Sequence, residues 1–154
     1  MSELKVSLQN DLTTAIRAKD QLTTGTLRMV LSAITNEEVS GKSARELSDQ
    51  EVITVLNREA KKRKEAATAF DDAQRSELAD RERAELGVLA KYLPEELSQD
   101  ALIAIISDAV AQVTATGQAG PSAMGAVMKI VSPQVTGRAD GAAVAAAVKA
   151  ALAN

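Results

Sequence analysis

The chain contains no cysteine, histidine or tryptophan, and its only aromatic residues are Phe70 and Tyr92. Without cysteine it has no disulfide framework, no thiolate nucleophile and no cysteine-based metal site. Without histidine it lacks the commonest general base and metal ligand. Because aromatic residues are so scarce, Leu, Val, Ile and Ala must form the core, a composition that favours close-packed helices over a sheet.

The overall charge is small and negative. The 154 residues carry 18 Lys and Arg against 21 Asp and Glu, a net charge of −3. An acidic chain does not bind nucleic acid through net charge alone. The first residues lack an apolar signal region, and no run approaches the ~20 apolar residues of a membrane span. We therefore expect a cytoplasmic protein without a membrane partner.

The composition changes at Leu93-Pro94. Most charged residues precede this point, whereas the remainder of the chain is apolar and has few charges. Such a shift marks a domain boundary. We expect an all-α fold with an N-terminal helical-hairpin domain of residues 1–93 and a small three-helix tail domain of residues 94–154.

Apolar residues recur at helical spacing along the chain. The stripe Leu4–Ile16 predicts one helix and the stripe Leu27–Ile34 a second, which should end near Gly41 in a left-handed cap. Ser48 should open a third helix, with Glu51 three residues later completing a capping box.

No proline or glycine interrupts residues 52–86, so the next two helices are either separate or fused. The count is then seven helices or six. Pro94 should end this run, and Ser98 should open a new helix. A further helix should end before Pro133, and Asp140 should cap the last one.

The densest positive charge lies on the third predicted helix, in a segment that we call the basic ridge. One interpretation is a solvated helix face that neighbouring glutamates neutralise. The other is a row of cations that follows nucleic-acid phosphates. The members of the basic ridge are Arg58, Lys61, Lys62 and Lys64.

Two further arginines are predicted to have structural roles. Arg63 falls on the otherwise apolar stripe of its helix, so it either forms a buried ion pair, with Glu37 or Glu38 as candidate partners, or presents its guanidinium between helices. The ion pair is the favoured reading. Arg28 lies about two turns from Asn36 on one side of a helix, and we expect it to bond between helices.

The tail contains two distinctive segments, Met124–Lys129 (Met-Gly-Ala-Val-Met-Lys) and Gly137–Gly141 (Gly-Arg-Ala-Asp-Gly). Together with Leu27–Met29 and Tyr92–Pro94, they make nearly the whole chain resemble the GatB/YqeY family. Members of this family share a small helical tail with the GatB subunit of the tRNA-dependent amidotransferase. The family usually has a glycine near the position of Gln74, which would separate two helices there.

The resemblance implies a function. Lys129 and Arg138 match basic positions of the amidotransferase tail, which resembles a tRNA-contacting module, and Lys149 lies where it can join them. The implied protein is a non-catalytic accessory or tRNA-binding protein related to glutamine-dependent carbon–nitrogen ligases. Its implied partners are tRNA or a protein of the translation or amidotransferase machinery.

Other tail residues have structural interpretations. Met124 and Met128, at helical spacing, are typical of core filler. Gly125 weakens its helix, which suggests a close approach by another backbone. Gly137 should supply a positive φ at the corner before Asp140.

The sequence shows no Gly-rich phosphate loop, metal-ligand cluster or nucleophile–base pair. We therefore expect neither a cofactor nor a metal. Two alternatives to RNA binding remain open: a helical protein–protein interaction module without a nucleic-acid ligand, and an enzyme with amidotransferase-related activity that takes glutamine as amido-nitrogen donor. Clustering of the tail cations with the basic ridge would favour RNA, and an exposed apolar groove would favour a protein partner.

Overall fold

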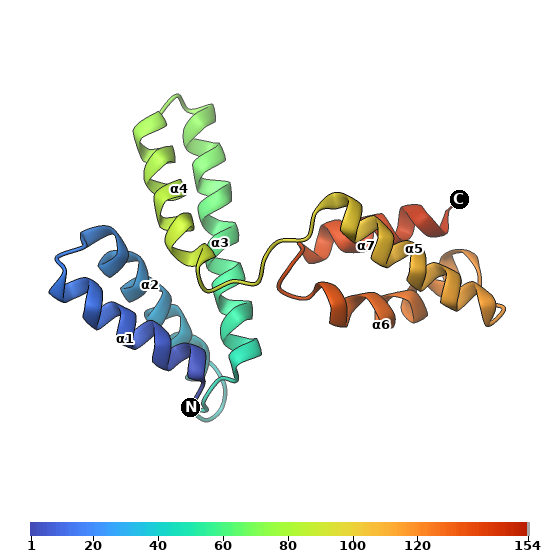
Figure 1. Ribbon diagram of the computed structural model, residues 1–154, viewed down its shortest axis with the longest axis horizontal. Coiled ribbons are helices and arrows are strands. Elements are labelled where there is room, and N and C mark those ends of the chain that lie inside the picture. Colours follow the sequence, from blue (N-terminus) through green and yellow to red (C-terminus); the bar gives the residue numbers. More distant parts are fainter. Residues whose placement is uncertain (154) are drawn as a thin grey trace. The chain divides into compact units, whose positions relative to one another are not determined.

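The computed structural model describes residues 1–153 and contains, over that range, seven α-helices, one short 3₁₀ helix and no strand (Figure 1). The expected all-α class is confirmed. The elements in chain order are α1 (Glu3–Arg17), α2 (Gln21–Glu38), α3 (Asp49–Asp72), α4 (Ser76–Ala90), α5 (Gln99–Ala115), η1 (Gly120–Ala123), α6 (Met124–Val135) and α7 (Gly141–Leu152).

The chain divides into two compact units, Met1–Leu93 and Pro94–Asn154. The first unit holds α1 to α4, and the second holds α5 to α7 with η1. That each unit folds on its own stays a prediction.

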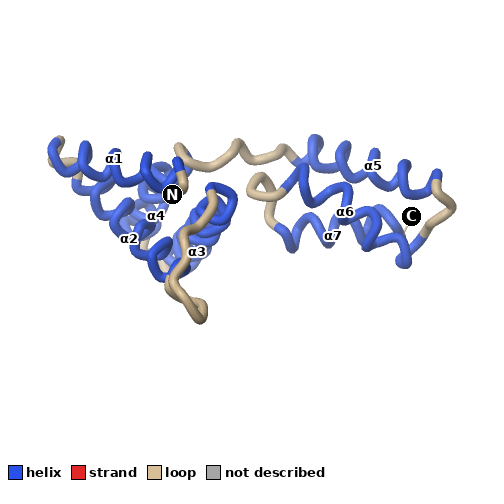
Figure 2. Tube along the Cα trace, turned by 90° about the horizontal axis from the view of Figure 1, so that it is seen from below, coloured by secondary structure: helices blue, strands red, loops and turns tan. Residues whose placement is uncertain are grey.

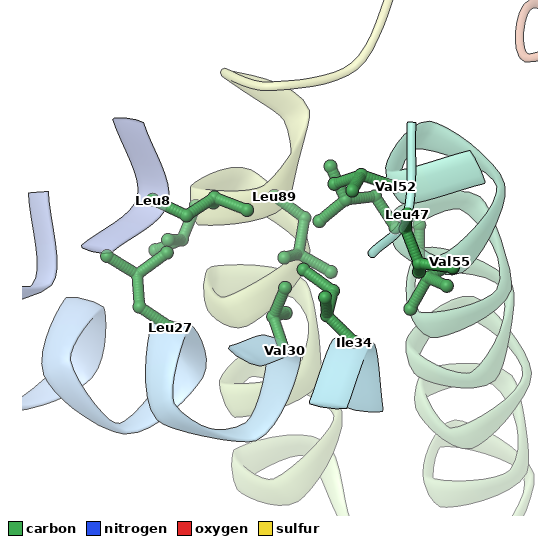
Figure 3. Close-up of a cluster of buried hydrophobic side chains, with 11 residues drawn as sticks. Leu8, Leu27, Val30, Ile34, Leu47, Val52, Val55 and Leu89 are labelled. Atoms are coloured by element: carbon green, nitrogen blue, oxygen red, sulfur yellow. The ribbon is translucent and has the colours of Figure 1, made fainter. Parts of the chain in front are cut away.

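All four helices of the first unit contribute to its core. Leu8 of α1, Leu27 and Val30 of α2, Val52 of α3 and Leu89 of α4 are each 0% exposed. Figure 3 shows these side chains pointing toward one another across the helices. Each buried Leu or Val stabilises the fold by ~1.5–3 kcal/mol relative to an exposed one, so this cluster fixes the packing of the four helices.

Side-chain caps set the starts of α2 and α3. Asp20 accepts a hydrogen bond from the Thr23 amide at 3.0 Å. The expected capping box is present, because the Ser48 hydroxyl accepts from the Glu51 amide and the Glu51 carboxylate accepts from the Ser48 amide. The prediction for Gly41 is wrong: α2 already ends at Glu38, and Gly41 is not among the glycines with positive φ.

Helices α3 and α4 are separate, which decides between seven helices and six. The break lies at Gln74, which takes the left-handed conformation with φ 58°. The Gln74 amide donates to the Asp71 carbonyl at 2.9 Å and the Arg75 amide donates to the Phe70 carbonyl at 2.8 Å. These two bonds satisfy the last carbonyls of α3 in a Schellman motif, so the turn forms without the usual glycine.

Figure 2 shows the three α-helices of the second unit, and aliphatic side chains from all three form the core between them. Ile106 of α5, Val127 and Val131 of α6, and Val144 and Val148 of α7 are all at most 3% exposed. Because these residues recur every three or four positions, one side of each helix faces the core and the opposite side faces solvent.

We expected α6 to end before Pro133, but the helix continues through this proline to Val135. Proline removes one amide donor from the helix, and that loss is limited here because Pro133 is exposed and close to the helix end. Val131 and Val135 are both buried, so the last turn is held by core packing. The Thr136 amide still donates to the Ser132 carbonyl at 3.0 Å.

The most apolar helices belong to the second unit. No single helix within residues 1–153 is both long and apolar enough to cross a membrane. By length and composition alone, α5 and the η1–α6 segment would qualify only as a pair, which is bent by 103°.

Candidate nucleic-acid interface

The basic ridge lies exposed along α3, but carboxylates pair with two of its four cations. Arg58 pairs with Glu37 of α2 at 3.1 Å, and Lys62 pairs with Glu59 at 2.8 Å. The other two ridge lysines also interact with other groups. A phosphate that approaches this surface must compete with these interactions, so the ridge attracts nucleic acid less than its sequence suggests. The exposed ridge residues are Arg58, Lys61, Lys62 and Lys64.

Arg63 is buried, with 3% of its surface exposed, and it lies between α3 and α4. Its Nη1 donates to the Glu59 carbonyl at 3.0 Å and to the Glu59 carboxylate at 3.1 Å, and its Nε donates to Glu85 at 3.2 Å. The suggested partners Glu37 and Glu38 are wrong, because Glu37 pairs with Arg58 and Glu38 with Lys5. Arg63 therefore joins helices within the first unit and is not available to a ligand.

The Glu59 carboxylate is paired with two cations, Lys62 and Arg63. Burial raises the pKa of its carboxyl group, but hydrogen bonds from Lys62 and Arg63 outweigh burial, and the net pKa is lowered from its usual 4.5. The carboxylate is thus held in its charged form opposite two cations. We read the cluster of Arg63, Glu59 and Glu85 as structural.

Arg28 lies exposed on α2, and its side chain makes no hydrogen bond or ion pair within the described part of the chain. The expected inter-helix bond from Arg28 is therefore not observed. Its neighbour Met29 takes part in the contact between α2 and α3 instead, since Arg63 Nη2 donates to the Met29 sulfur at 3.9 Å.

The tail corner is tightly bonded. Gly137 has φ 79°, the positive value expected from the sequence. Arg138 Nε donates to the Glu95 carbonyl at 3.2 Å, and the Arg138 carbonyl accepts from the Leu97 amide at 2.9 Å. Asp140 caps α7 by accepting from the Ala143 amide. Arg138 thus ties the corner to the segment before α5, a role that the sequence could not reveal because Glu95 contributes only its main chain.

The remaining tail residues divide into core and surface. Met124 and Met128 are half-buried against the core of the second unit. The backbone contact expected at Gly125 is wrong, because a Cβ built there has nothing within 4 Å. Lys129 and Lys149 are exposed, and neither makes an ion pair among residues 1–153.

These features define a class of all-helical proteins with two units. Buried ion pairs join helices of the four-helix unit, and hydrogen bonds fix the corner of the three-helix tail. Within the described residues, no group of three or more His, Cys, Asp and Glu side chains is placed to hold a metal ion. The family model for Yqey-like proteins matches residues 5–152, and the chain belongs to this family.

The chain is also similar to several fungal proteins. An uncharacterized protein of Schizosaccharomyces pombe is 31% identical over 96 residues, which cover 62% of this chain and 76% of the relative. Altered inheritance of mitochondria protein 41, mitochondrial, is 34% identical over 87 residues in Clavispora lusitaniae, covering 56% of this chain and 49% of the relative. The protein of that name in Saccharomyces cerevisiae strain YJM789 is 33% identical over 90 residues, covering 57% and 47%.

These relatives bear on two points. This chain matches about half the length of the two proteins named for mitochondria, at 49% and 47%. The expected cytoplasmic location is contradicted by the same two relatives, because both are named as mitochondrial.

Proposed function

We propose that this protein is a non-catalytic accessory protein that binds tRNA weakly and is related to glutamine-dependent carbon–nitrogen ligases. Membership of the Yqey-like family supports the proposal, as does the resemblance of Met124–Lys129 and Gly137–Gly141 to the amidotransferase tail. The observation that carries it is the exposure of Lys129 and Lys149, on two helices that pack together, without an ion pair in the described chain.

The expected affinity is low because the net charge is −3. Binding at physiological salt should be micromolar or weaker. It should fall steeply as salt rises, because each phosphate that a cation neutralises adds roughly 0.7–0.9 to the slope of log affinity against log salt.

A fluorescence titration with total tRNA at low salt tests the proposal. Replacing Lys129 and Lys149 together with alanine should lower the affinity and reduce the salt slope by about 1 to 2, while the melting temperature stays unchanged because both side chains are exposed. Arg138 is a poorer test residue, since its guanidinium bonds to the Glu95 carbonyl and its loss should loosen the corner. The proposal fails if the parent protein shows no saturable binding.

A second candidate function is a protein-interaction module. Leu22 and Met29 favour it, because they are 41% and 52% exposed and lie seven residues apart on one side of α2. Exposed apolar side chains aligned in this way are typical of surfaces that pack against another helix. A negative tRNA titration together with a partner captured by the parent, but lost after Leu22→Ser and Met29→Ser, would favour this function.

A further inference from the structure

Three exposed cations of the first unit differ from those of the basic ridge. They are Arg17 at the end of α1, Lys19 in the turn between α1 and α2, and Lys91 just after α4. None of them makes an ion pair or a side-chain hydrogen bond within residues 1–153. We call these three residues the turn patch.

One hydrogen bond joins α1 to the residues just after α4 and so places Lys91 beside α1, the helix that ends at Arg17. The Tyr92 hydroxyl donates to the Asp11 carboxylate at 2.7 Å, which fixes the residues after α4 against α1. Asp11 precedes Arg17 by six residues, a rise of ~9 Å along a helix. Hydrogen bonds from Thr23 and, to a smaller extent, the charge of Lys91 lower the pKa of Asp20, the residue that follows Lys19.

Lys19 occupies a position that stability alone would give to glycine. Its φ is 58°, in the left-handed region. The Lys19 amide donates to the Ile16 carbonyl and the Asp20 amide to the Ala15 carbonyl, the pair of bonds that closes a Schellman motif. A side chain is strained in this conformation, and strained residues cluster at functional sites. The helix dipole also favours a cation here, so the experiment must separate the two explanations.

Binding to nucleic acid gains free energy when cations replace the counterions of phosphates. A lysine already paired with a carboxylate must first give up that partner, as Lys62 would give up Glu59. The cations of the turn patch make no ion pair within residues 1–153, although the charge of Lys91 acts on the Asp20 carboxylate. Two carboxylates lie nearby, and both accept hydrogen bonds from neutral donors, Asp11 from Tyr92 and Asp20 from the Thr23 amide and hydroxyl.

We propose that the turn patch, and not the basic ridge, is the surface of the first unit that contacts the phosphate backbone of RNA. This inference rests on the proposed tRNA-binding function and names the residues that carry it out in this unit. The ridge then serves the fold, through the ion pairs of Arg58 with α2 and of Lys62 with Glu59.

Two variants with the same loss of charge test the inference in the full chain. The first is Arg17→Gln, Lys19→Gln and Lys91→Gln, and the second is Lys61→Gln, Lys62→Gln and Lys64→Gln. In titrations of labelled total tRNA, the turn variant should lose about fivefold or more in affinity at low salt and about 2 in salt slope. The ridge variant should bind within about twofold of the parent, for the reason given above.

Each outcome of this titration has a distinct meaning. Loss of binding in the ridge variant alone, or equal loss in both variants, overturns the inference and leaves the proposed function standing. Absence of any binding by the parent overturns the proposed function and the inference with it. A turn variant that binds like the parent also overturns the inference.

Lys19→Gly separates a binding role from a structural one. Removing the strained side chain should raise the melting temperature by a few degrees while it weakens tRNA binding and lowers the salt slope by about 1. If Lys19 serves only the helix dipole, its loss should lower the melting temperature and leave binding unchanged, and the inference is then wrong for this residue.

Discussion

Lys19 and Gln74 are the non-glycine residues in the described chain with a positive φ, each 58°. Both follow the end of a helix, where glycine or asparagine is usual because a Cβ is strained in the left-handed conformation. The hydrogen bonds of the turn hold each residue there. Lysine and glutamine carry no local signal for this conformation, and near Gln74 the resemblance to a family that usually has a glycine there was the sequence's pointer to a turn.

We predict that Gln74→Gly stabilises the protein by about 0.5–1 kcal/mol. The glycine removes the backbone strain, and the greater freedom of the unfolded chain offsets part of that gain. Urea denaturation followed by circular dichroism measures the change. Ala73→Gly is the matched control, because Ala73 has φ −85° and should gain nothing. A Gln74→Gly variant no more stable than the parent would show that the turn is not strained.

The tail corner gives the opposite case, a glycine that cannot be replaced. Gly137 has φ 79°, so Gly137→Val should destabilise the second unit by roughly 1–3 kcal/mol. Asp140→Ala should cost about 1 kcal/mol, because it removes the cap of α7. Thermal melts that match the parent for both variants would contradict this account of the corner.

At the scale of helices, the sequence predicted the residue at which a helix starts better than the residue at which it ends or the side chains that it contacts. Ser48, Ser98 and Asp140 cap helices as expected, because capping depends on residues within one turn of each other. The continuation of α6 through Pro133 was missed, since it depends on the burial of Val135 in a core that only the folded unit forms.

The candidate site was predicted less well for a related reason. Residue type and helical spacing identified Arg63 as a buried cation, but the choice of Glu59 and Glu85 over Glu37 depends on how α3 packs against α4. The neutralisation of the basic ridge also depends on a second helix, because Glu37 of α2 reaches Arg58. Exposed charge counts in a sequence therefore overstate the charge that is available to a ligand.

We predict that Arg63→Met destabilises the first unit by about 3 kcal/mol. Methionine preserves most of the volume but leaves Glu59 and Glu85, which are 10% and 12% exposed, without their common partner. Arg58→Met breaks the more exposed pair with Glu37 and should change the stability by less than about 1 kcal/mol. Urea denaturation at neutral pH compares the two, and equal effects would mean that burial does not set the strength of these ion pairs.

The same cluster predicts a dependence on pH. The folded-state pKa of Glu59 lies below its usual 4.5, so its contribution is present above about pH 4.5 and is lost as the pH falls through the folded pKa. Glu59→Gln should therefore weaken the fall in unfolding free energy below pH 4.5. Denaturation curves between pH 3 and 7 measure this slope. An unchanged slope in the variant would assign the acid sensitivity to other carboxylates.

For the whole molecule, the two units have separate cores, and we predict that they fold independently. Limited proteolysis should cut between Ala90 and Ser98, and a fragment of residues 94–154 should remain helical by circular dichroism, though only marginally stable because small domains bury little surface. Leu27→Ala should lower the stability of the first unit by ~2–5 kcal/mol, because Leu27 is fully buried there.

The decisive measurement is the unfolding of the second unit in the full chain that carries Leu27→Ala. If the units are independent, Asp140→Ala and Leu27→Ala should each shift a separate unfolding transition. Each substitution should then change the free energy of unfolding of its own unit by the same amount alone and in the double variant. A random-coil spectrum for the fragment, or a single transition that both substitutions shift, would mean that the tail requires the first unit in order to fold. In that case, the cations of the tail and of the turn patch could not be assigned to separable binding surfaces.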